Sequence, residues 1–261
     1  MMLSDPFLQS LVTRLDGGNT VAISLAGSHA RDEGGPYSDV DFHLYVRQMP
    51  TNPNEAYSLR FVEGHLVSIS VTTLEEEGAN LRNPKKALRA VPGLCQARIL
   101  LDKDGSLAAL KEQAEAFTWE PLQKAANAFA SWNLSGCAEE VHKVLDGLAQ
   151  RDESKTLYAI WGLTRDLALT LLVQAGVMIP TENAFIDLAQ KTAGRTSAWT
   201  CQFRQAIGLD PLPTGEPAYI GFGIAGLCLY RATAGILQDI LLPEEAGVVH
   251  RTLEIITEAG Y

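Results

Sequence analysis

The spacing of hydrophobic and polar residues divides the chain into two parts. In the first hundred residues, short apolar or alternating segments show the side-chain period of two that is typical of β-strands. The predicted strands cover residues 20–26, 39–46, 57–62, 65–73 and 97–101. From Ser106 onward, apolar residues recur every three or four positions, which favours helices. The pattern predicts an N-terminal domain over residues 1–118, with strands and helices, and a helical domain over residues 119–261.

Capping and turn residues predict where these elements begin and end. Asp5, followed by Pro6, is expected to cap a first helix that a Gly-Gly pair at 17–18 terminates. The Glu-Gly pair at 63–64 is a hairpin signal between two predicted strands. We expect about five helices in the second domain. They are separated by turn formers at Pro121, residues 176–180, residues 208–217 and Pro243.

The composition is that of a globular protein without a nucleic-acid-binding surface. The 261 residues are 46% hydrophobic, which allows a sizeable core. The formal net charge of −10 argues against a polyanionic partner, because such partners require clustered lysine and arginine. The four cysteines lack Cys-x-x-Cys spacing and are expected to be free thiols.

The N-terminus does not resemble a signal peptide, and no apolar run approaches the roughly 18 residues that a membrane span needs. We therefore expect a cytoplasmic protein with neither a membrane nor a nucleic acid as partner.

The segment 25–46, LAGSHARDEGGPYSDVDFHLYV, carries the strongest functional pattern. Gly27 and Ser28 follow an apolar strand, and after a polar loop a second strand opens with Asp39 and Asp41. Because side chains alternate along a strand, the two carboxylates are expected on one face, with the apolar residues of the strand on the other. The sequence thus predicts two acids at one end of a sheet, close to a Gly-Ser turn.

This combination suits a phosphate group and a divalent cation. Neighbouring carboxylates repel each other unless a cation lies between them, and hard oxygen ligands suit Mg²⁺. Glycine lets the backbone approach a phosphate, while a serine hydroxyl and nearby N–H groups can hold its oxygens. Alone, a Gly-Ser pair is usually a turn and an Asp-x-Asp is usually a solvated strand end. The prediction therefore rests on their ordered combination.

The pattern of Gly27-Ser28, a short loop and Ser38-Asp39-x-Asp41 resembles the signature of the DNA polymerase β-like nucleotidyltransferase superfamily. It is most similar to the branch that modifies aminoglycoside antibiotics. The resemblance implies an α+β protein, in which an N-terminal nucleotidyltransferase fold, a short mixed β-sheet flanked by helices, precedes a C-terminal α-helical bundle. It also implies that Gly27, Ser28 and Ser38 bind the nucleoside triphosphate. Asp39 and Asp41 would hold two Mg²⁺ ions.

The chain departs from the superfamily at a third acidic position. Relatives usually carry another carboxylate on the strand beside the aspartate pair, whereas this chain has Ser68 or Ser70 at the matching place. A serine can hydrogen-bond but supplies no charge, so either the site has two metal carboxylates or another acid reaches it. The acids nearby in sequence are Glu63, Glu75, Glu76 and Glu77, and the last three are expected at the solvated start of a helix.

A second candidate pair lies in the segment NLSGCAEEVHKVLDGLA. Glu139 and Lys143 are four residues apart, so a helix places them on one face. From spacing alone, a surface ion pair explains them equally well. The pair also resembles an arrangement in some aminoglycoside nucleotidyltransferases, where a glutamate of the helical domain deprotonates the acceptor hydroxyl and a lysine follows one turn later. By this resemblance Glu139 is the base, Lys143 stabilises the phosphate oxygens, and the catalytic residues come from both domains.

Other side chains have both a functional and a structural interpretation. His43 follows the aspartates on the same face and could line the site or be a hydrogen-bonded structural histidine. Glu140 and Asp166 could bind a cationic acceptor or simply face solvent. Four aromatic residues could stack on sugar rings or belong to the core. They are Trp132, Tyr158, Trp161 and Trp199.

The expected activity is the Mg²⁺-dependent transfer of AMP from ATP to a hydroxyl of a small, cationic molecule, with an aminoglycoside as the leading acceptor and antibiotic resistance as the role. Two alternatives stay open. One is a nucleotidyltransferase that modifies a protein, as in toxin–antitoxin pairs. The other is a non-catalytic nucleotide-binding protein, which the missing third acid would allow. A homodimer would cover apolar surface on the helical domain.

Overall fold

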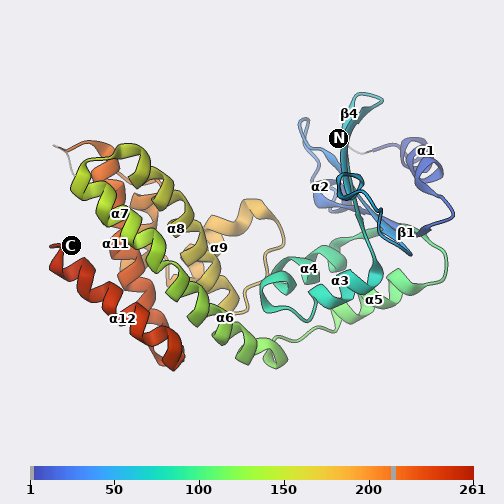
Figure 1. The fold of residues 1–261 in the computed structure, drawn as a ribbon. Coiled ribbons are helices and arrows are strands. Elements are labelled where there is room, and N and C mark those ends of the chain that lie inside the picture. The colour runs from blue at the N-terminus through green and yellow to red at the C-terminus, as the bar shows by residue number, and fades with distance from the viewer. Residues whose placement is uncertain (1–2, 213–215) are drawn as a thin grey trace. The chain divides into compact units, whose positions relative to one another are not determined.

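The chain divides into two compact units, unit 1 (Met1–Thr118) and unit 2 (Trp119–Tyr261). The structure is a computed structural model and describes residues 3–212 and 216–261. Unit 1 contains a sheet with helices on both faces, and unit 2 is helical (Figure 1). The expected α+β architecture is confirmed.

Unit 1 contains a five-stranded mixed sheet in the order β3-β4-β2-β1-β5. The central pair β2 and β4 is parallel, and the other neighbours are antiparallel. The strands are β1 (Thr20–Ala26), β2 (Val40–Val46), β3 (Tyr57–Val62), β4 (His65–Thr72) and β5 (Arg98–Asp102). The other elements of this unit are α1 (Asp5–Leu15), α2 (Gly27–Ala30), η1 (Pro53–Glu55), α3 (Leu74–Asn80), α4 (Pro84–Gln96) and α5 (Ser106–Glu115).

The five predicted strands are all present, with ends shifted by one residue in three of them. The largest consequence is that β2 begins at Val40, so Asp39 directly precedes the strand. The Glu63-Gly64 hairpin is confirmed, since both residues have positive φ angles, 51° and 84°. A two-residue loop of this kind matches the twist of the flanking strands.

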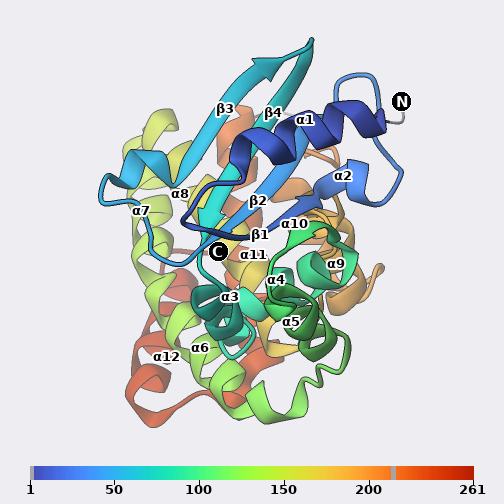
Figure 2. The same ribbon diagram turned by 90° about the vertical axis from the view of Figure 1, so that its right-hand side faces the viewer.

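One face of the sheet packs on α1, which lies along it (Figure 2). The apolar residues of α1 recur at helical spacing, and the inward residues of three strands meet them. This core contains Phe7, Leu8, Leu11, Ile23, Leu25, Val40, Phe42, Val67 and Ile69. The alternation along β2 thus buries Val40 and Phe42 on this side and leaves Asp41 and His43 on the other.

The N-cap of α1 is Ser4, and Asp5 is the first helical residue. The expectation that Asp5 caps this helix is therefore wrong by one position. The Ser4 hydroxyl accepts a hydrogen bond from the Phe7 amide at 3.3 Å. Serine and aspartate are equally good caps, and Pro6 is acceptable at either of the first two helical positions, so the sequence did not distinguish them.

The helices α3, α4 and α5 pack against one another in unit 1. Thr73 caps α3 by accepting a hydrogen bond from the Glu76 amide at 3.1 Å. Asn83 caps α4 by accepting from the Lys85 and Lys86 amides. Together with β2, α3 and α4 line a pocket on the sheet face that carries His43. This is the face that also carries Asp41.

Unit 2 contains seven α-helices in its described residues, rather than about five. They are α6 (Gln123–Gly136), α7 (Ala138–Gln150), α8 (Glu153–Gln174), α9 (Phe185–Ala193), α10 (Ala198–Ala206), α11 (Ala218–Leu237) and α12 (Pro243–Glu258), with short turns η2 (Glu120–Leu122), η3 (Glu182–Ala184) and η4 (Gln238–Ile240). The pattern did not reveal the α6–α7 junction, because Cys137 keeps nearly helical angles there. The break at Gly194, with φ 90°, was also missed.

The core of unit 2 is built around α8, which packs against α6, α7, α9 and α11 (Figure 1). Trp199 of α10 is 1% exposed and stacks on Phe203 with ring centroids 4.9 Å apart. Its indole N–H donates to the Thr233 hydroxyl at 2.8 Å. Trp199 is therefore a core residue with a satisfied donor, and not an exposed platform for a sugar ring.

Two segments of unit 2 are long and apolar enough to cross a membrane, which corrects the expectation that none would be. They are Glu153–Gln174 and Ala218–Ile240. In their apolar 18-residue windows, 61% of the first and 50% of the second are buried inside the protein. Core helices of a globular protein have the same length and composition. The absence of a membrane partner stays a prediction.

Candidate functional site

The predicted Gly-Ser turn lies at the end of β1. Gly27 follows Ala26 directly and begins α2, a single helical turn. Its φ of +64° lies in the left-handed region, where a side chain is unfavourable. In addition, a Cβ atom at this position would overlap Oδ2 of Asp41. Glycine is therefore needed here for two separate reasons, and the second ties the turn to the predicted carboxylate pair.

Asp41 is held in place by its neighbours on both sides. Its register partners are Ala26 on β1 and Ser68 on β4. The Ser68 hydroxyl donates to Asp41 Oδ1 at 2.6 Å, and Ser68 is 5% exposed. Asp41 itself is partly exposed. The Asp41 carboxylate is thus hydrogen-bonded to Ser68 and packed closely against Gly27. It therefore has little freedom to rotate.

The serine that lies beside Asp41, where the resemblance implies a third carboxylate, is therefore Ser68 and not Ser70. Of the acids considered as substitutes, Glu63 lies in the hairpin turn, and Glu76 accepts a hydrogen bond from Thr72 at 3.2 Å. Glu77 accepts from Asn80 at 3.1 Å. Within residues 3–212 and 216–261, three or more metal-binding acids, histidines or cysteines do not gather at one place. The carboxylate that packs against the Gly-Ser turn is that of Asp41.

The loop between α2 and β2 is closed by its own hydrogen bonds. The Gly35 amide donates to the Ser38 hydroxyl at 2.9 Å, and the Ser38 amide donates to the Gly35 carbonyl at 3.2 Å. The Ser38 hydroxyl, predicted to contact the nucleotide, therefore already accepts a hydrogen bond within this turn. It retains its own proton for a ligand, since a hydroxyl can accept and donate at the same time.

His29 is a site residue that sequence reasoning missed. It is 8% exposed, and its ring lies so close to Gly34 that a Cβ atom there would overlap it. Burial lowers the pKa of His29, although a hydrogen bond to the Ser38 backbone acts in the opposite direction. The imidazole thus holds the loop that leads to Asp39. The sequence contains no spacing signal for this contact, because it depends on how the loop folds back.

His43 continues the carboxylate face of β2. Burial lowers its pKa, while the charges of Glu77 and Asp41 oppose that shift. A neutral imidazole two residues beyond Asp41 can donate and accept one hydrogen bond each. Arg31, which follows α2, is paired with Glu33 at 2.7 Å and donates to Gln96 at 3.2 Å. These bonds give Arg31 a structural role in the same loop.

On unit 2, the predicted pair lies on α7 and includes a third residue. Lys143 Nζ is 2.9 Å from Glu139 Oε1 and 2.8 Å from Glu140 Oε1. The Glu139 side chain is 76% exposed, and its hydrogen bond with Lys143 lowers its pKa. The same two carboxylates raise the pKa of Lys143. Lys143 is therefore positively charged at neutral pH, and Glu139 is a solvated, weakly basic carboxylate.

Glu140 is more enclosed than its neighbour. Its side chain is 23% exposed and approaches Gly162 of α8. Its second oxygen, Oε2, is buried and has no hydrogen-bond partner among the described residues. An unsatisfied carboxylate oxygen is costly unless a donor comes to it. Asp166, also on α8, pairs with Arg165 at 3.5 Å.

Three of the four predicted aromatic residues are exposed on unit 2. Trp132 of α6 is 62% exposed, Tyr158 of α8 is 66% and Trp161 of α8 is 69%. Tyr158 and Trp161 meet edge to face, with ring centroids 6.4 Å apart. Large exposed aromatic groups on a folded helix surface are typical of sites that bind a ligand or a partner.

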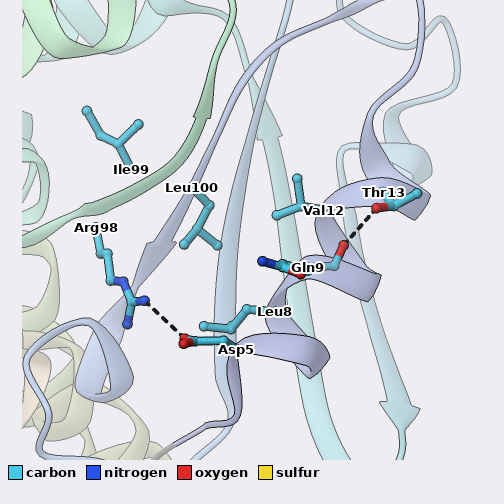
Figure 3. A pocket seen from close by; sticks show the side chains of 8 residues that line it. All are labelled: Asp5, Leu8, Gln9, Val12, Thr13, Arg98, Ile99 and Leu100. Atoms are coloured by element: carbon cyan, nitrogen blue, oxygen red, sulfur yellow. Dashed lines mark hydrogen bonds and ion pairs between the residues drawn. The ribbon is translucent and has the colours of Figure 1, made fainter.

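Unit 1 has another hollow on the opposite face, between α1 and β5 (Figure 3). Its volume is about 400 Å³, and its walls include Leu8, Val12 and Leu100. Arg98 at its edge lies 3.7 Å from Asp5. This hollow is on the α1 side of the sheet, away from the face that carries Asp41.

A similar arrangement of elements occurs in a known structure. A nucleotidyltransferase-like protein from Exiguobacterium sibiricum matches 97% of this chain and 79% of its own, with a TM-score of 0.52 and 13% sequence identity. The fold is nucleotidyltransferase-like. No protein-family model and no curated protein match the chain. At this level of identity the similarity concerns the fold and does not extend to substrate or activity.

The contact between Gly27 and Asp41 leads to a prediction about stability. Gly27→Ala should destabilise unit 1 by more than the roughly 1–2 kcal/mol expected for a left-handed alanine, because the new Cβ must also displace the Asp41 carboxylate. The free energy of unfolding from urea denaturation measures this.

Gly64→Ala is the matched control, since Gly64 also has a positive φ but has no atoms within 4 Å of an added Cβ. It should show the strain alone. Equal losses in the two variants would mean that Asp41 is not packed against the turn.

Proposed function

We propose that the protein is a Mg²⁺-dependent nucleotidyltransferase that transfers AMP from ATP to a hydroxyl group of a small molecule, with an aminoglycoside antibiotic as the leading acceptor. The observation that carries this proposal is the packing of Asp41 against the Gly27 turn, with Ser68 hydrogen-bonded to the same carboxylate. The packing brings together the turn that would bind phosphate and the acid that would bind the metal ion. The nucleotidyltransferase-like fold supports the same interpretation.

The residues present fit a magnesium ion. The Ser68 hydroxyl and the Asp41 carboxylate are hydrogen-bonded to each other, and Asp39 lies two residues before Asp41 in the chain. Mg²⁺ in proteins commonly binds through one or two carboxylates together with substrate phosphates. Asp39 and Asp41 would hold the metal ions, and the resemblance to nucleotidyltransferases implies that there are two ions. When bound, Mg²⁺ takes up negative charge on the reacting phosphate. Ser68 orients Asp41 and adds no charge of its own.

The remaining roles in unit 1 belong to the chain's own groups. The backbone at Gly27 can approach a phosphate because the glycine has no side chain, and the Ser28 hydroxyl can donate to a phosphate oxygen. The Ser38 hydroxyl can donate in the same way while it accepts from Gly35. His29 keeps this loop folded against Gly34.

Unit 2 would activate and bind the acceptor. A carboxylate that accepts the hydroxyl proton makes the oxygen a better nucleophile, and Glu139 is the base implied by the resemblance. Lys143, held between two carboxylates, would stabilise negative charge on the phosphate. The acids Glu140 and Asp166 and the exposed aromatic rings suit a cationic acceptor that carries sugar rings.

The proposal also includes a cytoplasmic location, and neither nucleic acid nor membrane as a partner, in keeping with the net charge of −10. The arrangement at Ser68 favours a second candidate function. Because a serine occupies the place of the third carboxylate, a protein that binds a nucleotide without transferring it is the alternative.

Pyrophosphate release tests the proposed reaction. We expect release from MgATP, measured with a coupled enzymatic assay, in the presence of at least one member of a panel of aminoglycosides and lincosamides. Asp41→Asn, which keeps the size of the side chain, should reduce the rate by at least about a hundredfold, because the metal-binding charge is lost. Asp104→Asn, at an exposed turn of the same unit, should leave it unchanged.

Release that needs an acceptor and Asp41 supports the transferase. MgATP binding without release, for every acceptor in the panel, supports the non-catalytic alternative, and release that requires a protein acceptor supports a protein-modifying enzyme. Either of the last two results contradicts the proposed small-molecule transfer.

Glu139→Gln and Glu140→Gln form a matched pair that tests the base. If Glu139 is the base, its variant should lose kcat by about a hundredfold, the typical contribution of a general base, whereas Glu140→Gln should mainly raise KM for a cationic acceptor. Steady-state kinetics on the acceptor identified above gives both constants. The opposite outcome, with the kcat loss in Glu140→Gln, would contradict this assignment. The base would then be Glu140, whose buried Oε2 has no hydrogen-bond partner among the described residues.

A further inference from the structure

A pocket of unit 1 contains a group of cations that the proposed reaction does not use. It lies between β2 and the helices α3 and α4, and its volume is about 470 Å³. Strand β2 contributes two polar aromatic side chains, and α3 and α4 contribute charged ones. The residues on which the argument rests are His43, Tyr45, Glu77, Lys85, Lys86 and Arg89.

The charge of this pocket opposes that of the chain as a whole. The sequence has 31 acidic residues against 21 lysines and arginines, yet Lys85, Lys86 and Arg89 line the pocket together with the single acid Glu77. Lys85 and Arg89 are four residues apart on α4, and Lys86 and Arg89 are three apart, so all three lie along one side of the helix.

The strand side of the pocket offers hydrogen-bond donors. Burial raises the pKa of Tyr45 to about 12, with the charge of Glu77 acting in the same direction, so the phenol keeps its proton at neutral pH. His43 lines the same wall, with its ring centroid 6.4 Å from that of Tyr45, and an imidazole ring carries at least one N–H donor. Cations on one wall and N–H and O–H donors on the other are the groups that hold the oxygens of a phosphate.

The pocket also adjoins the carboxylate site along β2. His43 is two residues after Asp41, and a strand advances by roughly 7 Å over two residues. A chain of two or three phosphates is long enough to cover such a distance. We propose that this pocket is a phosphate-binding site, occupied either by the phosphates of the nucleotide or by a separate phosphorylated molecule.

The first of these occupants rests on the proposed function, and the second does not. Binding of inorganic tripolyphosphate and of orthophosphate to the full chain, without metal or acceptor, tests the site itself by titration calorimetry. Lys86→Gln/Arg89→Gln should weaken tripolyphosphate binding by about tenfold or more, because charge-assisted hydrogen bonds are lost. Arg82→Gln is the control, since Arg82 is exposed on the α3–α4 connection and does not line the pocket.

Glu77→Gln gives a change of the opposite sign, which a folding defect would not produce. Removal of the acid from a cationic pocket should tighten tripolyphosphate binding, and the midpoint of thermal unfolding serves to check that each variant is folded. The proposal fails if tripolyphosphate does not bind, if the double variant binds it as the unaltered chain does, or if Arg82→Gln weakens it equally.

MgATP titrations of the same variants then distinguish the two sources. A parallel loss of MgATP affinity in Lys86→Gln/Arg89→Gln assigns the pocket to the nucleotide's phosphates. Unchanged MgATP affinity, with tripolyphosphate binding lost, assigns it to a separate phosphorylated molecule. Both results support a phosphate site, and neither depends on pyrophosphate release, so failure of the transfer reaction and failure of this site are observed separately.

Discussion

The position of one carboxylate determines most of what unit 1 can do. Asp41 packs against a turn that only glycine allows and accepts a 2.6 Å hydrogen bond from Ser68. The sheet makes both contacts unavoidable, because Ala26 and Ser68 are the residues paired with Asp41 on the neighbouring strands. A carboxylate fixed in this way would bind a cation at little entropic cost, since its rotation is already restricted.

A serine lies beside Asp41 at the position where the resemblance to nucleotidyltransferases implies a third carboxylate. Ser68 fills the place beside Asp41 and supplies a proton donor, whereas a carboxylate there would repel Asp41 until a cation bound. Cationic side chains lie two residues farther along β2 instead. There, Lys86 and Arg89 of α4 line the same pocket as His43. Positive charge from the protein and positive charge from a metal ion could thus share the task of binding a polyphosphate.

Much of the fold could be predicted from local patterns, and the missed features depend on tertiary contacts. Strand alternation and the Glu63-Gly64 turn are local signals, and they gave the sheet's hairpin correctly. The α6–α7 junction was missed because the backbone at Cys137 stays almost helical. Within the candidate site, the sequence indicated Gly27 and Asp41. It could not indicate His29, whose ring packs on a loop glycine, because that contact exists only after the loop folds.

We take Asp41 and the Gly27 turn to form one metal-dependent nucleotide site. Titration calorimetry of a non-hydrolysable ATP analogue, with and without Mg²⁺, tests this without requiring an acceptor. We expect Mg²⁺ to tighten binding of the analogue to the unaltered protein, and Asp41→Asn to remove this gain while the protein stays folded. A gain that persists in Asp41→Asn, or an analogue that never binds, would contradict it.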